Sequence, residues 1–162
     1  RRLVNHILSA DQAGTDAILV TCSSIGKATE LGRELVDPLV MRVDEPMAKK
    51  AIETGKRIGV IATLSSTLNP TVDLIKRQGI EDLEVTAKLC EGAFEAVISG
   101  DATTHDKIVA DGILELVNQV DVIVLAQASM ARVVNTLPAD KVTVPVLSSP
   151  KLAIEHLARE LA

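Results

Sequence analysis

Six short runs rich in Val, Ile and Leu alternate along this chain with stretches of helical periodicity, and this alternation limits the fold more than any other feature. Each run is bounded by a polar residue, Gly or Pro. Continuous apolar runs are typical of strands in a parallel sheet that helices cover on both faces. The sequence therefore predicts an α/β fold, with strands at residues 16–21, 38–43, 57–62, 83–89, 121–125 and 142–147.

Helices are expected between these strands. Over residues 106–119 the apolar side chains fall on one stripe, as in an amphipathic helix packed against a core. Asn69 and Ser149 each stand directly before a proline. Because Ser and Asn cap helices and Pro favours the first helical position, helices are expected to begin at Pro70 and Pro150.

The two halves of the chain resemble each other. Residues 16–27 align with residues 121–132 at an offset of 105, and Asp16, Ile18 and Ser24 have identical partners in the second segment. The flanking helices keep this offset to within two residues, which favours a duplicated lobe. The alternative is that any two strand-to-helix turns of an α/β protein look alike.

The predicted architecture is thus two similar lobes with mainly parallel sheets flanked by helices and a pseudo-twofold repeat. Residues 1–44 and 148–162 would form the first lobe, and residues 45–147 the second. The second lobe begins with a strand that has no counterpart in the first. The N-terminal part of the first lobe, roughly fifty residues, is therefore expected to precede Arg1.

Composition excludes several classes of protein. The chain has 17 Lys and Arg against 22 Asp and Glu, a net charge of −5, and no basic cluster, so nucleic acid is not an expected partner. No apolar run approaches the ~20 residues of a membrane span. Cys22 and Cys90 form neither a disulfide framework nor a metal-binding pattern, so no metal and a reducing cytoplasm are expected. One Phe and no Tyr or Trp predict an aliphatic core.

Cys22 is the strongest candidate for chemistry. It follows an expected buried strand and precedes a helix, and ligands of open α/β sheets bind at such strand ends. The positive end of a helix dipole favours the thiolate form of a thiol at this place. Ser23 and Ser24 add hydroxyl groups that suit a small anion. The alternative is that Cys22 is a packed residue at a strand end.

Other polar groups are weaker candidates. Thr63 and Thr67 belong to a hydroxyl-rich turn after the strand at 57–62, where ordinary helix capping is the alternative. Cys90 is expected to be packed at a strand end. His105 lies near a helix start and is expected at most to cap it, while the helical residues His6 and His156 are expected to face solvent, so no catalytic triad or metal site is predicted.

Taken in order, five motifs resemble those of the aspartate/glutamate racemase superfamily, and especially its hydantoin-racemase-like branch. They are DAILVTCSSIG at 16–26, RIGVIATLSSTL at 57–68, LCEGAF at 89–94, DVIVLAQASMA at 121–131 and VPVLSSP at 144–150. The resemblance extends over nearly the whole chain. It implies two α/β lobes with a site in the cleft between them, which agrees with the repeat.

The resemblance also implies a mechanism without a cofactor. In this family one cysteine thiolate removes the proton from the carbon next to a carboxylate, and a second thiol returns a proton to the opposite face. Cys22 matches the first cysteine. Ser23, Ser24, Thr63 and Thr67 match positions that contact the substrate.

The chain departs from the family at the second cysteine. Gln127 stands there, and Ala128 and Ser129 follow it in the turn expected to bind substrate. An amide can hydrogen-bond a ligand, but it cannot accept and deliver a proton at neutral pH. A site with one thiol suits decarboxylation with stereospecific protonation, or an isomerisation or elimination, better than two-thiol racemisation.

Three functions remain open. The first is an enzyme of the racemase or isomerase type that acts on an amino acid or small carboxylic acid through one thiol, Cys22, with Gln127 orienting the ligand. The second is a one-thiol decarboxylase or lyase of the same family, and the third is a non-catalytic carboxylate-binding or regulatory protein. The chain is expected to form a homo-oligomer, as many relatives do.

Overall fold

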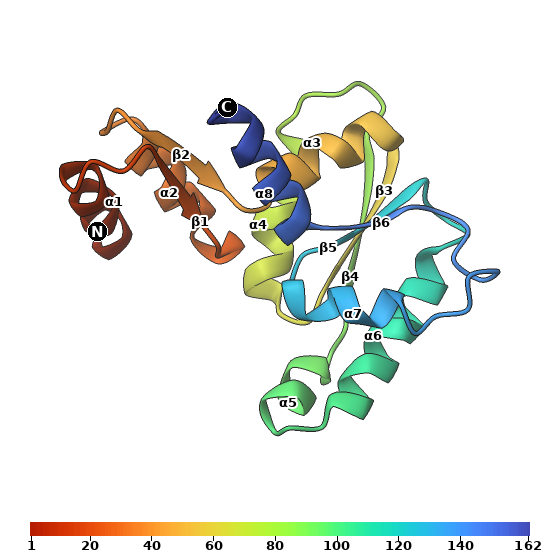
Figure 1. Cartoon of the computed structure of the whole chain (residues 1–162). Helices are drawn as coiled ribbons and strands as arrows, with labels where there is room; N and C mark the ends of the chain where they lie inside the picture. Colours follow the sequence, from red (N-terminus) through yellow and green to blue (C-terminus); the bar gives the residue numbers. More distant parts are fainter.

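The computed structural model describes residues 1–162 as six strands, eight α-helices and two short 3-10 segments (Figure 1). The strands are β1 (Ala17–Val20), β2 (Leu39–Arg42), β3 (Arg57–Ala62), β4 (Glu84–Leu89), β5 (Val122–Leu125) and β6 (Val146–Ser148). The helices are α1 (Arg2–Gln12), α2 (Gly26–Arg33), α3 (Glu45–Thr54), α4 (Ser65–Lys76), α5 (Ala93–Ile98), α6 (Ala102–Leu116), α7 (Ala131–Val134) and α8 (Ser149–Glu160). The 3-10 segments are η1 (Ser23–Ile25) and η2 (Ala128–Met130).

All the strands pair in parallel, and they form two sheets. The smaller sheet has the order β1-β2, and the larger has the order β4-β3-β5-β6. Helices lie between successive strands along the chain. Parallel strands require such connections, because the chain must cross from the carboxyl end of one strand back to the amino end of the next. The predicted α/β class with parallel sheets is confirmed.

The larger sheet is buried on both faces. One face packs against α3 and α4, through Met47, Ala51, Leu68 and Ile75 among others. The other face packs against α6 and α7 in a second cluster of buried residues. β5 is buried at every position, which explains why its sequence is a continuous apolar run rather than an alternating one.

The smaller sheet also has a helix on each face. On one side Ile7 of α1 packs against Val20 and Val40. On the other side Ala153 of α8 packs against Met41 and Val43. Helix α8 therefore lies between the two sheets, as Figure 1 shows, because Leu152 on the same helix packs against the core of the larger sheet.

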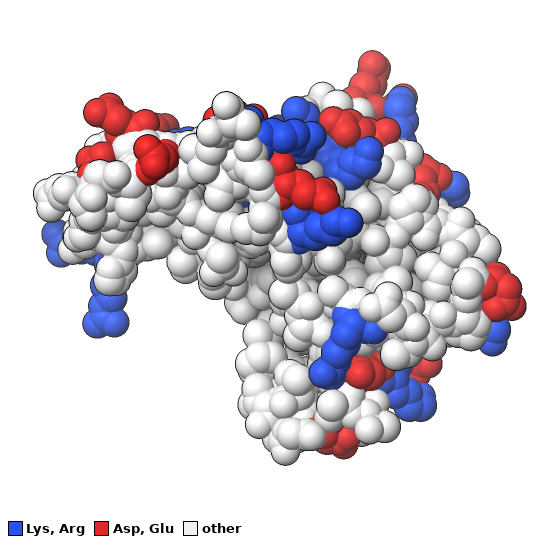
Figure 2. Space-filling model, in the orientation of Figure 1, with Lys and Arg blue, Asp and Glu red and all other residues white.

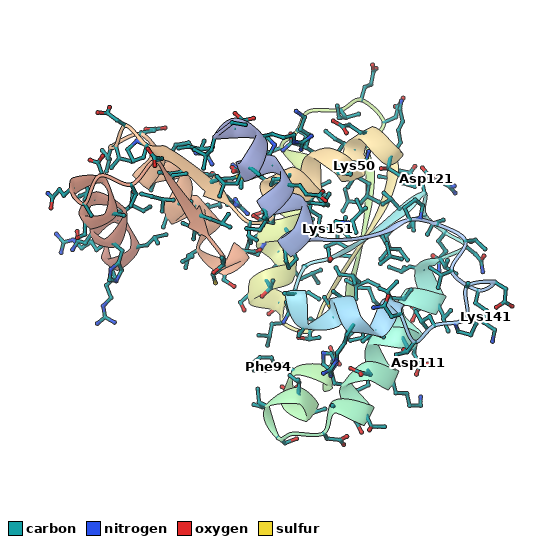
Figure 3. The ribbon with its side chains drawn as sticks, viewed as in Figure 1. Lys50, Phe94, Asp111, Asp121, Lys141 and Lys151 are labelled. Atoms are coloured by element: carbon teal, nitrogen blue, oxygen red, sulfur yellow. The ribbon has the colours of Figure 1, made fainter.

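Both cores are aliphatic, as composition predicts. The buried hydrophobic side chains are Val, Ile, Leu, Met, Ala and Cys, with no aromatic ring among them. Phe94 is half-buried on α5, the helix that follows the carboxyl end of β4 (Figure 3).

Two helix starts differ from the prediction. Helix α4 begins at Ser65, after the extended residue Leu64, and Pro70 lies inside it, so the start expected at Pro70 is wrong. A proline near the start of a helix removes a single N–H from the hydrogen-bond ladder, and burial of Leu68 and Leu74 on either side of it offsets that loss. Helix α8 begins at Ser149, with Ser148 rather than Ser149 in the capping position.

Helix α6 and strand β6 also differ from the prediction. Helix α6 begins earlier, at Ala102, because the Asp101 side chain accepts a hydrogen bond from the Thr104 N–H at 3.0 Å. His105 therefore does not cap the helix. Strand β6 is shorter than expected and begins at Val146, because Pro145 before it has no N–H to extend the ladder.

The order of elements is consistent with the sequence repeat. The segments η1 and η2 each follow a strand of a parallel pair, and they lie 105 residues apart. β1 precedes η1 as β5 precedes η2, and α1 and α6 precede those strands. Helices α3 and α8 follow the second strand of each pair, β2 and β6.

The surface shows both signs of charge. Figure 2 shows acidic and basic side chains interspersed on the visible face, without a large patch of either sign. No helix combines the length and the apolar composition that a membrane crossing would require.

A buried arginine connects the smaller sheet to the elements around it. Arg42, the last residue of β2, is 2% exposed, and Asp44 beside it is fully buried. The Arg42 guanidinium donates two hydrogen bonds to Asp44, from Nε to Oδ1 at 2.9 Å and from Nη2 to Oδ2 at 2.8 Å. Its third nitrogen, Nη1, donates to Oε1 of Glu30 on α2. A buried cation needs this degree of pairing, because removal of one partner leaves an uncompensated charge.

Glu30 extends this network to α4. Arg77, directly after that helix, donates to both Glu30 carboxylate oxygens, from Nη1 at 3.0 Å and from Nη2 at 2.9 Å. Hydrogen bonds from Arg77 and Arg42 lower the pKa of Glu30 from 4.5 to about 2, against the opposing effect of burial. The ionised carboxylate thus ties α2, β2 and α4 together.

We predict that Glu30→Gln reduces the acid sensitivity of the fold. Because folding lowers the pKa of Glu30, the stabilisation by its carboxylate is fully present above pH 4.5 and is lost as the pH falls toward 2. After allowance for solvent screening, the wild type should lose roughly 1–2 kcal/mol more than the variant over this interval. Urea denaturation at several pH values measures this difference. Glu53→Gln, at an exposed site paired with Lys50 at 3.9 Å, is the control and should behave like the wild type.

Candidate functional site

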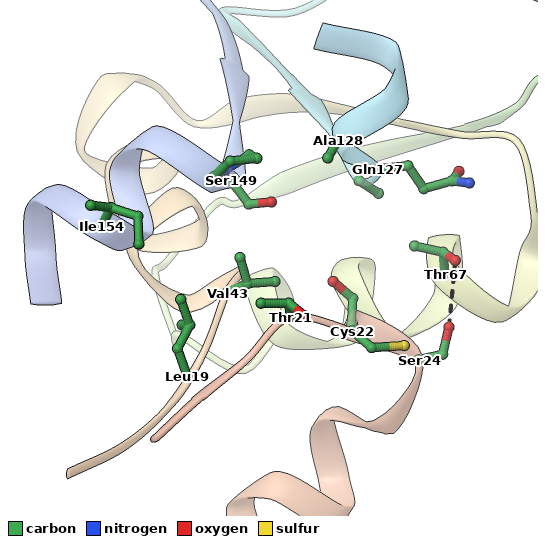
Figure 4. Close-up of a pocket in the computed structure, with 13 residues that line it drawn as sticks. Leu19, Thr21, Cys22, Ser24, Val43, Thr67, Gln127, Ala128, Ser149 and Ile154 are labelled. Atoms are coloured by element: carbon green, nitrogen blue, oxygen red, sulfur yellow. Dashed lines mark hydrogen bonds between the residues drawn. The ribbon is translucent and has the colours of Figure 1, made fainter. Parts of the chain in front are cut away.

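A cavity of about 320 Å³ opens between the two sheets, at the carboxyl ends of their strands (Figure 4). The turns after β1, β2, β5 and β6 and the first turn of α4 contribute to it. Its lining residues are Leu19, Thr21, Cys22, Ser23, Ser24, Val43, Thr67, Ala126, Gln127, Ala128, Ser149, Pro150 and Ile154. None of these carries a charged side chain. Ligands of open parallel sheets bind at this end of the strands.

The Cys22 thiol lies at the wall of this cavity that belongs to the smaller sheet. β1 ends at Val20, and Cys22 has an extended backbone, with φ −131° and ψ 108°, before the chain turns into η1. Cys22 is exposed. The alternative interpretation, in which Cys22 is a packed residue at a strand end, is therefore wrong. Helix α2 begins only at Gly26, so the residue that follows the thiol is in a 3-10 turn and not in the helix that the sequence predicts.

The turn that carries Cys22 rests on the buried arginine. A Cβ atom added to Gly26 would overlap the guanidinium group of Arg42, so only glycine fits at the start of α2 without displacing that side chain. The network of Arg42, Asp44 and Glu30 therefore supports the Cys22 turn where it enters α2.

Hydroxyl groups of two turns meet beside the thiol. Ser24 Oγ of η1 and Thr67 Oγ1 of α4 lie 3.5 Å apart, a contact drawn as the dashed line in Figure 4. Ser24 is exposed and Thr67 is largely buried. Both can donate to or accept from a ligand in the cavity, because a hydroxyl has one donor and two acceptor sites.

Gln127 lies across the cavity from Cys22, and its amide is held by Thr63. The Thr63 backbone N–H donates to Gln127 Oε1 at 2.6 Å, and Gln127 Nε2 donates to Thr63 Oγ1 at 2.8 Å. A backbone N–H can only donate, so these bonds fix which end of the amide is the oxygen. No other protein group accepts the second hydrogen of Gln127 Nε2.

The structure brings together most of the residues that the sequence singles out. Those that line the cavity are Cys22, Ser23, Ser24, Thr67, Gln127 and Ala128. Thr63 is buried behind Gln127 and outside the lining, where it positions the amide. Ser129 is exposed in η2 and is also outside the lining.

Sequence reasoning missed the contribution of β6 and α8. Ser149, Pro150 and Ile154 line the cavity, and the polar pair Ser148-Ser149 after an apolar run is the same signal that marks Cys22 and Thr63. Leu19 and Val43 were missed for a different reason. Apolar residues at strand ends cannot be distinguished by sequence from residues of the core.

The second thiol is not part of this site. Cys90 is 2% exposed and belongs to the buried cluster between the larger sheet and α6. Burial raises the pKa of the Cys90 thiol, which makes it a poor source of thiolate. No thiol therefore faces Cys22 across the cavity.

The histidines also lie outside the cavity. His105 is fully buried in α6, with Nδ1 2.7 Å from Asp106 Oδ1. His6 is exposed on α1, and the half-buried His156 is on α8. No group of three or more His, Cys, Asp and Glu residues has the geometry of a metal site.

The sequence profile of the Asp/Glu/hydantoin racemase family matches residues 1–157, and the chain belongs to that family. The resemblance inferred from the motifs is confirmed. A search of curated proteins found no match.

Solved structures show the same fold. Allantoin racemase from Klebsiella pneumoniae superposes with a TM-score of 0.77 and 19% identity, over 98% of this chain and 64% of that one. Glutamate racemase from Bacillus anthracis gives 0.70 and 19%, over 98% and 65% of the two chains. A double mutant of arylmalonate decarboxylase gives 0.68 and 16%, over 96% and 71%. The chain thus spans slightly less than two thirds of the length of the allantoin racemase and of the glutamate racemase.

We predict that iodoacetamide modifies Cys22 and spares Cys90 in the native protein. Cys22 is exposed, whereas the Cys90 thiol is buried and its pKa is raised, so the two rates should differ by at least about tenfold. Peptide mass spectrometry after timed alkylation measures the two rates. Unfolding in guanidinium should make both thiols react. Equal labelling without denaturant would contradict the burial of Cys90.

Proposed function

We propose that this protein acts, without a cofactor, at the carbon next to the carboxylate of a small organic acid, and that Cys22 transfers the proton. The observation that carries the proposal is the exposed Cys22 thiol in a cavity that also presents the Ser23 and Ser24 hydroxyls and the Gln127 amide. Membership of the Asp/Glu/hydantoin racemase family supports it.

The proposed step is a proton transfer from carbon to sulfur. The Cys22 thiolate takes the α-proton, the C–H bond breaks, and its electron pair moves into the carboxylate to give an enediolate-like carbanion. The charge that develops on the carboxylate oxygens needs hydrogen-bond donors that are already in place. The Ser23 and Ser24 hydroxyls and the free hydrogen on Gln127 Nε2 are the donors proposed for this role.

Gln127 limits the stereochemical outcome. Racemisation requires a proton donor on the face opposite the thiolate, and an amide cannot serve as one at neutral pH. The thiol formed at Cys22 returns its proton to the face from which it was taken. The expected reactions are therefore exchange of the α-proton with retention of configuration, or loss of carbon dioxide from a malonate-type acid followed by protonation from Cys22. The likeness to arylmalonate decarboxylase supports the decarboxylase alternative.

A non-catalytic role is the second candidate. The observation that favours it is the pair of hydrogen bonds that holds the Gln127 amide against Thr63. An amide fixed in this way suits recognition of a carboxylate or amide, and binding alone needs no proton transfer. This alternative predicts a ligand whose affinity does not depend on the Cys22 thiol.

The proposal places the site between two lobes of one chain. Residues 1–44 and 148–162 would form the first lobe, and residues 45–147 the second. The packing of α8 against Met41 and Val43 of the smaller sheet supports the assignment of the C-terminal segment to the first lobe. Association into a homo-oligomer remains a prediction, and light scattering tests it.

We predict that Cys22→Ala abolishes exchange and that Gln127→Cys adds racemisation. The first variant removes the one thiol of the cavity, and the second restores a thiol on the opposite side. The full-length protein is incubated in heavy water with amino acids, hydantoins and substituted malonates. Proton NMR measures α-proton exchange and decarboxylation, and chiral chromatography measures racemisation. Cys90→Ala, which removes the other thiol, is the control and should leave the rates unchanged.

The outcomes separate the candidates. Exchange or decarboxylation that requires Cys22 supports the enzyme. Binding of a carboxylate that Cys22→Ala leaves intact, with no turnover of any compound, supports the non-catalytic role. Racemisation by the wild type would contradict the one-thiol mechanism.

A further inference from the structure

The cavity has two chemically different ends. In Figure 4, Cys22, Ser24, Thr67 and Gln127 lie at one end, and Leu19, Val43 and Ile154 lie together at the other. The polar end comes from the turns after β1 and β5 and from α4. The apolar end comes from the smaller sheet and α8.

The apolar end lacks any group that could neutralise a charge. No Asp, Glu, Lys, Arg or His occurs in the lining of the cavity. Two arginines of the smaller sheet and its neighbours are already paired: Arg42 is buried against Asp44 and Glu30, and Arg77 binds Glu30. A charged group placed against Leu19, Val43 and Ile154 would meet apolar side chains and find no counter-ion among the lining residues.

The size of a ligand also follows from this arrangement. The cavity of about 320 Å³ is at the small end of the range for ligand pockets, and Phe94 does not contribute to its lining. An aromatic wall for stacking is therefore missing among the residues of this cavity. The three aliphatic side chains provide a surface for a branched alkyl group.

We propose that the ligand is a carboxylate whose α-carbon carries an uncharged, branched aliphatic substituent, which packs against Leu19, Val43 and Ile154. The orientation of the ligand, with its carboxylate at the polar end and its substituent at the apolar end, rests on the proposed function. This assignment excludes acids with a second carboxylate on the substituent, as in aspartate or glutamate, from the preferred ligands.

Two matched probes test the assignment. Isopentylmalonate and carboxyethylmalonate have the same reacting centre and nearly the same shape. They differ in whether the substituent ends in two methyl groups or in two carboxylate oxygens. Protection of Cys22 from iodoacetamide measures binding of each probe, and decarboxylation and α-proton exchange in heavy water measure turnover. We expect the isopentyl probe to bind at least about tenfold more tightly, because carboxyethylmalonate places a charge without a counter-ion against three apolar side chains.

A variant that adds a positive charge to the apolar end provides a second test. Ile154 is at the rim and 57% exposed, so Ile154→Lys should fold. It places a cation at the apolar end and should reduce the preference for the isopentyl probe by at least about tenfold. Ile98→Lys is the matched control, because Ile98 is 68% exposed on α5 and outside the cavity. The control should keep the preference of the wild type.

The results distinguish this inference from the proposed function. Selective protection of Cys22 by the isopentyl probe without any turnover would support the ligand class and refute catalysis. Turnover with equal or better use of carboxyethylmalonate would support catalysis and overturn the ligand class. Failure of both probes to protect Cys22 would also overturn the ligand class.

Discussion

The ion pair between Arg42 and Asp44 is the interaction on which the rest of the site depends. A guanidinium group with 2% exposure is stable only when carboxylates surround it, and Asp44 and Glu30 provide them. Arg42 ends β2, Asp44 precedes α3, and Glu30 is on α2. One side chain thus fixes the position of two helices relative to the strand. Because the same guanidinium lies under Gly26, it also sets the position of the turn that carries Cys22.

The sequence predicts the fold well because the signals involved are local. Five of the expected strands agree with the structure to within a residue at each end, since a buried parallel strand must be a continuous apolar run. The errors occur where a local signal competes with packing. Pro70 looks like a helix start, but burial of Leu68 and Leu74 extends α4 across it. Pro145 interrupts a run that otherwise looks like strand, and only the three residues from Val146 pair.

The site is less predictable, because its parts are distant in sequence. Cys22 and Gln127 could be found because each follows an apolar run in a recognisable turn. Nothing in the sequence indicates that Thr63 binds the Gln127 amide, since the two residues meet only after β3 and β5 pair. Leu19 and Ile154 are equally hidden, because their roles depend on how α8 crosses between the sheets.

The bond between Thr63 and Gln127 couples the chemistry of the site to the end of β3. Thr63 is buried, and its N–H has a side-chain oxygen as its acceptor. A cysteine at position 127 would offer that N–H only a weak sulfur acceptor. A substitution between Gln and Cys at position 127 therefore changes the hydrogen bonding of the Thr63 N–H, at the end of β3, as well as the chemistry of the site. Positions 63 and 127 form an energetically coupled pair, and substitutions at the two should be non-additive.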